Sequence, residues 1–267
     1  MFKFQEGYMY NMPAHFTGRK GTPSAQTYHD VCSIAISYET ERAALEKYVP
    51  EAFHLTEPLI MLNYSVCRAC DWLSGGSYSL VSVNAPVTYQ EGSEHLEGPF
   101  ALVLWENMTE PILFGRNNGM PKIFANIEDP HQVGDRVFTN LSHGGTPFLR
   151  IDFSKKERMS AEDLAPQSMN WFGWLYVPNI GRAGAALSHA TLYPQEFAWR
   201  DGWKGVGSVV WETGTPEQHP MQFPIIKALS ELPIKGYGEC SMKFGSNTLR
   251  GDLARALGIR GELARAA

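Results

Sequence analysis

Short apolar runs with a period of two recur along most of this 267-residue chain, and turn residues separate them. Residues 31–38, 59–67, 77–89 and 100–105 are typical of half-buried strands, with Ser-Gly-Gly and Glu-Gly-Ser turns between them. Further strands are predicted at residues 112–114, 136–141, 148–153, 171–177, 185–193 and 206–212. A strand about every 8–15 residues, with hardly a helix between, predicts antiparallel sheets closed into a barrel or sandwich.

Few segments of this sequence have apolar residues at the spacing of a helix. Residues 43–49 carry an apolar stripe among charged residues, and Pro50 ends the pattern. A short helix is predicted at residues 225–229, and a terminal helix at residues 249–267, where leucines and alanines alternate with arginines. No repeat, linker or change of composition divides the chain. We therefore expect residues 1–267 to form a single, mainly β domain (β-rich α+β) with a few short helices.

The composition excludes several classes of partner. Charged residues make up 19% of the chain, its net charge is −5 and it has no basic run, which argues against nucleic acid. No apolar segment approaches the roughly 18 residues that a membrane span needs. The first residues lack the basic region and apolar run of a signal peptide. We expect a cytoplasmic protein that binds neither nucleic acid nor membrane.

The cysteines and histidines do not form a metal motif. Cys67 and Cys70 make a CxxC, but on a strand this spacing sends two side chains to opposite faces, and no second pair completes a zinc set. The eight histidines include no HxH or HxxxH pair. The two thiols are therefore interpreted as buried and structural, and no metal site is expected.

Lys122 is difficult to explain as an ordinary surface lysine. It follows Pro121, and Met120, Ile123 and Phe124 flank it. An ammonium in apolar surroundings is costly unless it spends part of its time neutral. A neutral amine is a nucleophile that can form a Schiff base with a ketone. The alternative is a lysine whose stem covers apolar surface while its head reaches water.

The residues before this lysine favour the first interpretation. Gly115 and Gly119 bracket a tight excursion between apolar runs, and Pro121 fixes the backbone just before Lys122. A rigid turn that delivers one amine into an apolar pocket is what imine chemistry requires. A protonated imine withdraws electrons from the neighbouring carbon, which eases decarboxylation, retro-aldol cleavage and proton loss.

Several motifs together resemble one known family. The segment Gly115-Arg-x-x-Gly-Met-Pro-Lys122 resembles the lysine motif of the acetoacetate decarboxylase-like superfamily, whose activated lysine forms a Schiff base. Further landmarks stand in the family's order: Tyr38-x-Thr40, Val49-Pro-Glu51, Glu57-Pro-Leu59, Pro86-Val87, Val177-Pro-Asn179 and LSELPI at 229–234. The resemblance implies an antiparallel closed β-barrel or cone, with Lys122 as the catalytic amine. It also implies a homo-oligomer (tetramer or larger) and no metal or organic cofactor.

The departures from the family concern the decarboxylation machinery. In the decarboxylases an arginine and two glutamates line the pocket, and the landmarks put Val31, Asn63 and Leu80 at those positions. A second lysine that follows the reactive one is replaced by Ile123, and an acidic residue by Asn117. The groups that would position a β-keto carboxylate are therefore missing, although the amine is kept.

The resemblance consequently favours another use of the imine. Other members of the superfamily condense pyruvate with aldehydes and dehydrate the product, or act as hydratases. We expect a lysine Schiff-base lyase for small 2-oxo acids, of the aldolase-dehydratase or hydratase type. Arg116 could hold the substrate carboxylate or support the turn by a salt bridge, and Asn118 and Asn63 could orient a water or carbonyl. An acetoacetate decarboxylase is the alternative, and a non-catalytic binding barrel is less favoured.

Overall fold

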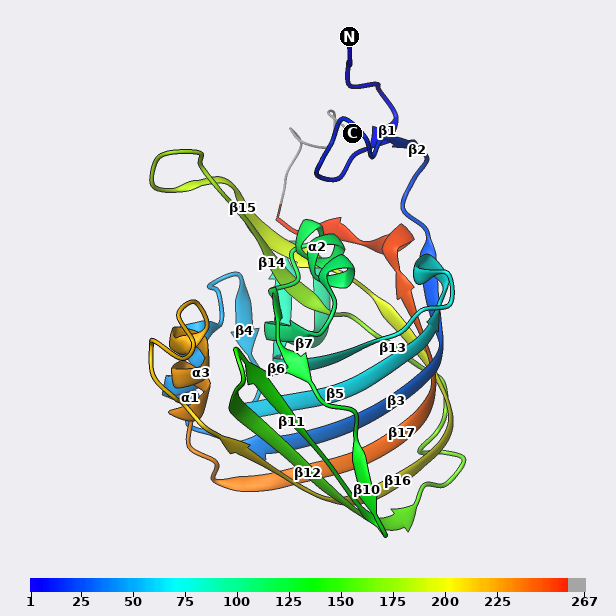
Figure 1. The fold of residues 1–267 in the computed structure, drawn as a ribbon, viewed down its shortest axis with the longest axis vertical. Helices are drawn as coiled ribbons and strands as arrows, with labels where there is room; N and C mark the ends of the chain where they lie inside the picture. The colour runs from blue at the N-terminus through cyan, green and yellow to red at the C-terminus, as the bar shows by residue number, and fades with distance from the viewer. Residues whose placement is uncertain (259–267) are drawn as a thin grey trace.

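The computed structural model describes residues 1–258 and contains one strongly curved sheet of 16 strands (Figure 1). The hydrogen-bonded path of this sheet runs β10 (His131–Val133), β11 (Arg136–His143), β12 (Thr146–Arg158), β16 (Gln195–Trp211), β17 (Gly236–Arg250), β3 (Ala25–Glu39), β5 (Leu59–Cys70), β6 (Tyr78–Glu91), β7 (Glu94–Glu106), β14 (Phe172–Pro178), β15 (Ala185–Leu192) and β18 (Arg255–Ala256). Four short strands pair beside it: β4 (Phe53–Leu55) with β6, β8 (Lys122–Phe124) with β7, β9 (Asn126–Ile127) with β11, and β13 (Gln167–Met169) with β16. The predicted mainly β fold is confirmed.

The sheet is antiparallel except around β7, which pairs in parallel with β8 and with β14. Within the described residues β10 and β18, the ends of the path, do not pair with each other, so hydrogen bonds leave the sheet open. Register shifts in the pairing of β17 with its neighbours mark bulges that bend the long strands. At one of them a Cβ on Gly245 would lie 2.2 Å from the Ala198 carbonyl oxygen, so only glycine allows this approach.

The core lies on the concave face of the sheet and follows the two-residue period of the strands. Alternate residues of β3 and β5 are buried: Cys32, Ile34, Ile36 and Tyr38 on the first, and Ile60, Leu62, Tyr64 and Val66 on the second. Trp105, at the end of β7, is fully buried in the same cluster, and its indole N–H donates to Gln222 Oε1 at 2.8 Å. The packing therefore fixes the end of β7, where the site described below begins.

Helices are short and few. The structure has α1 (Arg42–Leu45), α2 (Thr109–Asn117) and α3 (Phe223–Ser230), with 3₁₀ turns at Glu46–Tyr48, Asp71–Leu73 and Gly251–Leu253. The helix predicted at residues 43–49 is confirmed as α1 continued by a 3₁₀ turn, and α3 confirms the one predicted at residues 225–229. No helix within residues 1–258 combines the length and apolar composition needed to cross a membrane.

Two predicted elements are wrong. Residues 112–114 belong to α2 rather than to a strand. Three apolar residues fit either period, and Pro111 lies in the first helical turn, where its missing N–H costs no hydrogen bond. The chain from residue 249 to 258 completes β17 and forms a 3₁₀ turn and β18, so this part of the predicted terminal helix is absent; residues 259–267 lie outside the described part.

A small hairpin precedes the sheet at the N-terminus. Its strands β1 (Tyr8–Met9) and β2 (Arg19–Lys20) pair with each other and not with the main sheet. We refer to residues 8–20 as the N-terminal hairpin. Asn117, the last residue of α2, donates its side-chain amide to Asn11 Oδ1 at 2.8 Å, which ties the hairpin to that helix.

Candidate active site

Lys122 is held in place by the backbone of two parallel strands. It begins β8 opposite Leu104 of β7, and the Leu104 N–H donates to the Pro121 carbonyl at 3.0 Å. The preceding helix α2 ends in a left-handed glycine, Gly119 (φ +81°), a common way to terminate a helix. The excursion predicted between Gly115 and Gly119 is therefore the end of a helix, and it delivers Lys122 to the sheet with a side chain only 9% exposed.

A buried carboxylate faces the lysine amine. Glu106 is the last residue of β7, is 0% exposed, and its Oε1 lies 2.7 Å from Lys122 Nζ. Apart from Lys122, neither carboxylate oxygen has a polar partner among the described residues. Burial raises the pKa of Glu106, and the nearby Lys122 opposes that rise. A carboxylate in this state readily accepts a proton, so the pair can pass one between them.

Gly115 provides the space for the lysine side chain. A Cβ built on this helical glycine would lie 2.2 Å from Lys122 Cε and 2.7 Å from Nζ. No real Cβ approaches another heavy atom so closely. Glycine is therefore required at this position because the lysine side chain passes beneath α2, and not because the backbone turns there.

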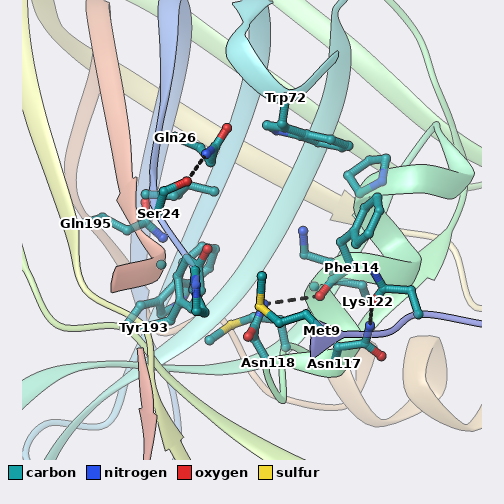
Figure 2. Close-up of a pocket in the computed structure, with 18 of the residues that line it drawn as sticks. Met9, Ser24, Gln26, Trp72, Phe114, Asn117, Asn118, Lys122, Tyr193 and Gln195 are labelled. Atoms are coloured by element: carbon teal, nitrogen blue, oxygen red, sulfur yellow. Dashed lines mark hydrogen bonds between the residues drawn. The ribbon is translucent and has the colours of Figure 1, made fainter. Parts of the chain in front are cut away.

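Lys122 opens into a cavity of about 620 Å³ beneath α2 and the N-terminal hairpin. Figure 2 shows Lys122 and Phe114 on one side of this space, Tyr193 and Gln195 across from them, and Trp72 at one end. Aromatic and aliphatic side chains share the wall with several polar ones, among them Gln26, Asn118 and Gln195. An amine on such a wall meets a carbonyl compound that enters the cavity.

The structure brings together some of the predicted site residues and not others. Asn118 lines the cavity with Lys122, and its side-chain amide donates to the Phe114 carbonyl at 3.2 Å. Arg116 is exposed and is not part of the cavity wall. Asn63 is also outside the wall, on β5, where Ser33 and Ser65 hydrogen-bond its amide.

An apolar cluster occupies the region where the decarboxylases carry charged groups. Val31 and Leu80 are buried together with Tyr28 and Tyr78, and neither lines the cavity. Cys67 and its CxxC partner, Cys70, belong to the same cluster, so the prediction that they lie on opposite faces is wrong. Ala69, with φ +49°, interrupts the strand alternation and turns both thiols to one side. All four cysteines of the chain are buried and free, as expected for structural thiols.

Sequence reasoning missed two charged residues of the site. Glu106 is separated from Lys122 by the whole of α2, and only the parallel register of β7 and β8 makes them neighbours. The one feature of the sequence that could have indicated a buried Glu106 is its position directly after the apolar run that ends at Trp105. Arg19 lines the cavity from the N-terminal hairpin, and its side chain has no ion pair or hydrogen bond within residues 1–258. Arg19 is itself solvent-exposed, and nothing in the neighbouring sequence distinguishes it from the other exposed arginines.

Comparisons with known proteins identify the family of this chain and proteins that share its fold. Residues 11–245 match the family described as acetoacetate decarboxylase (ADC). A curated relative, acetoacetate decarboxylase 3 of Mesorhizobium japonicum, is 31% identical over 197 residues, which cover 73% of each chain. Acetoacetate decarboxylase from Legionella pneumophila shares the fold with a TM-score of 0.73 at 18% identity, over 96% of this chain and 91% of that one. The enduracididine biosynthesis enzyme MppR, solved with pyruvate, shares it with a TM-score of 0.70 at 15% identity, over 93% and 97%. With its family match spanning most of the sequence, this chain belongs to the acetoacetate decarboxylase (ADC) family.

Proposed function

We propose that this protein is a Schiff-base-forming lyase that acts on small 2-oxo acids through Lys122. The observation that carries the proposal is the Lys122–Glu106 pair, buried in the wall of the cavity with 2.7 Å between Nζ and Oε1. A buried lysine beside a proton acceptor can attack a ketone as the neutral amine.

The chemistry follows from this pair. Glu106 accepts the proton of the ammonium, and the free amine attacks C2 of the oxo acid, whose carbonyl electrons move to oxygen. The resulting carbinolamine takes up a proton and loses water to give the iminium. The iminium then draws electrons from C3, which loses a proton to give an enamine. The enamine carbon can attack an aldehyde, after which a second water leaves and hydrolysis frees the product.

The size of the cavity supports two reactants rather than one. A cavity of about 150 Å³ accommodates a six-membered carbon ring, whereas the space beside Lys122 is about 620 Å³. A three-carbon oxo acid on Lys122 therefore leaves room for an aldehyde next to it. This favours aldolase-dehydratase or hydratase chemistry over decarboxylation of a four-carbon acid.

Trapping with borohydride tests the proposal directly. Incubation with pyruvate followed by borohydride should leave one reduced adduct on the peptide that contains Lys122, because the reductant converts the imine into a stable amine. Lys122→Met should abolish the adduct, and Lys47→Met, at an exposed helical position, should not. A folded parent protein that gives no adduct with pyruvate or with acetoacetate would contradict imine chemistry and favour a non-catalytic binding barrel.

Arg19 is the group that we expect to hold the substrate carboxylate, because it lines the cavity and has no other charged partner within residues 1–258. Arg19→Met should raise the half-saturating pyruvate concentration by about 10- to 100-fold, the value of one charged hydrogen-bonding group. The measurement is the exchange of the pyruvate C3 protons for deuterium, followed by NMR. Arg116→Met, which changes an exposed arginine outside the cavity, is the matched control. An effect of Arg116→Met and none of Arg19→Met would move the carboxylate site to Arg116.

Decarboxylation of acetoacetate is the second candidate, because the curated relatives bear the name of that activity. Release of carbon dioxide from acetoacetate that disappears in Lys122→Met would support it. Adduct formation with pyruvate, C3 exchange and no carbon dioxide release would support the favoured proposal.

A further inference from the structure

Two buried tyrosines and a tryptophan form a hydrogen-bonded group beside the cavity. The Tyr28 and Tyr78 hydroxyl oxygens lie 3.0 Å apart, and the Trp72 indole nitrogen lies 3.3 Å from the Tyr28 oxygen. Tyr28 and Trp72 both line the cavity that contains Lys122, whereas Tyr78 lies behind them (Figure 2 shows Trp72). Tyr28 and Tyr78 are only 3% and 4% exposed, so nearly all of their surroundings are protein.

Donor and acceptor counts and the position of the cavity together favour one direction for these hydrogen bonds. The Trp72 indole can only donate, so the Tyr28 oxygen accepts from it. Between the two tyrosines either hydroxyl could donate, and each order leaves one hydroxyl proton without a partner among the described residues. Tyr28 lines the cavity and Tyr78 does not, so the favourable order is the one in which Tyr78 donates to Tyr28. The Tyr28 oxygen then accepts two hydrogen bonds, and its own proton remains free for a ligand in the cavity.

Tyr28 and Trp72 share the cavity with the proposed nucleophile. Both line the same space as Lys122, and the charge of Glu106 acts on Tyr78, the hydrogen-bond partner of Tyr28. Burial raises the pKa of Tyr28 well above its usual value, and that of Tyr78 likewise. The Tyr28 phenol therefore stays protonated and able to donate throughout the neutral range.

We propose that the Tyr28 hydroxyl is a catalytic hydrogen-bond donor to the substrate oxygen when Lys122 attacks the carbonyl. As the nitrogen–carbon bond forms, the carbonyl electrons move to oxygen, and Tyr28 donates a hydrogen bond to the negative charge that develops there. Trp72 and Tyr78 are positioning residues, because each donates to the Tyr28 oxygen and so orients the free proton. Tyr28 is thus a neutral donor in a protein that has Val31 and Leu80 at positions where the resemblance implies charged residues in the decarboxylases.

This inference rests on the proposed imine chemistry, and its test separates the two. Tyr28→Phe removes one oxygen, so it should lower the rate of adduct formation with pyruvate by about 10²- to 10³-fold, the usual effect of losing one such donor. The amount of adduct at long incubation should equal that of the parent, because Lys122 is unchanged. The rate comes from borohydride quenching at successive times and mass spectrometry of the Lys122 peptide.

One control variant and one substitute variant complete the experiment. Tyr64→Phe removes another buried tyrosine hydroxyl, one that is not part of the cavity wall and donates to the Glu128 carbonyl, and should leave the rate unchanged. If Tyr28→Phe does not fold, Tyr78→Phe takes its place, with an expected decrease of about tenfold for one lost hydrogen bond. A parent protein without any adduct would overturn the proposed function. An adduct that forms at the parental rate in the folded tyrosine variant would overturn the role of Tyr28 alone.

Discussion

Replacing Glu106 by Gln should slow the exchange of the pyruvate C3 protons for deuterium by about 10²- to 10⁴-fold, the range for one general acid–base group. The amide keeps the shape of the side chain but can no longer take the proton from Lys122 or return it to the carbinolamine. The trapped adduct should persist in Glu106→Gln at long incubation, because the amine of Lys122 is unchanged.

Proton exchange by NMR and end-point trapping measure the rate and the amount of adduct separately. Glu97→Gln, at an exposed position on the same strand, is the matched control and should change neither. Exchange at the parental rate in Glu106→Gln would show that another group carries the proton. Loss of the adduct from a folded variant would show that Glu106 supports the shape of the site.

The substitution Gly115→Ala should inactivate the protein while leaving its fold intact. The new methyl group would lie 2.2 Å from Lys122 Cε, so the flexible end of the lysine must move away from Glu106. A displacement of about 1 Å at a reacting group costs about 10²-fold in rate, and we expect a loss of at least that size in adduct formation. The backbone should tolerate the change, because alanine favours a helix over glycine by about 1 kcal/mol.

Time-resolved trapping and thermal unfolding together test this prediction. Gly236→Ala, where a Cβ meets nothing within 4 Å, controls for the substitution itself. A Gly115→Ala protein that forms the adduct as fast as the parent would mean that the lysine does not need its position beneath α2. A Gly115→Ala protein that fails to fold would mean that the methyl group displaces the helix instead of the lysine.

The strands were predictable because one face of the sheet is buried and the other is wet. Buried and exposed residues alternate along much of β3 and β5. This apolar period of two recurs in enough strands to indicate a mainly β fold. Local exceptions could not be predicted this way. The left-handed Ala69 reverses the side of the next cysteine, and residues 112–114 of α2 look like a short strand because three apolar residues carry no period.

The lysine itself could be identified from its neighbours in sequence, but its partners could not. Pro121 and the flanking apolar residues mark Lys122 as unusual. Glu106 reaches it only through the parallel register of β7 and β8, and Tyr28 lines the same cavity from β3. Arg116 was expected in the site because it is close in sequence, yet it lies on the outer side of α2, whereas Arg19 arrives from the N-terminal hairpin. Proximity to Lys122 in sequence therefore does not predict which side chains line the cavity.

The cavity wall combines residues of the main sheet with residues of the N-terminal hairpin, and this affects how its specificity can change by mutation. The amine and its carboxylate lie on two strands whose backbones bond to each other, in the interior of the sheet. Met9, Asn11 and Arg19, which also line the cavity, lie on a hairpin whose strands pair only with each other. Mutations in the hairpin can therefore change which carbonyl compound is accepted without disturbing the reactive pair. New substrate preferences can arise in this lineage from about a dozen N-terminal residues.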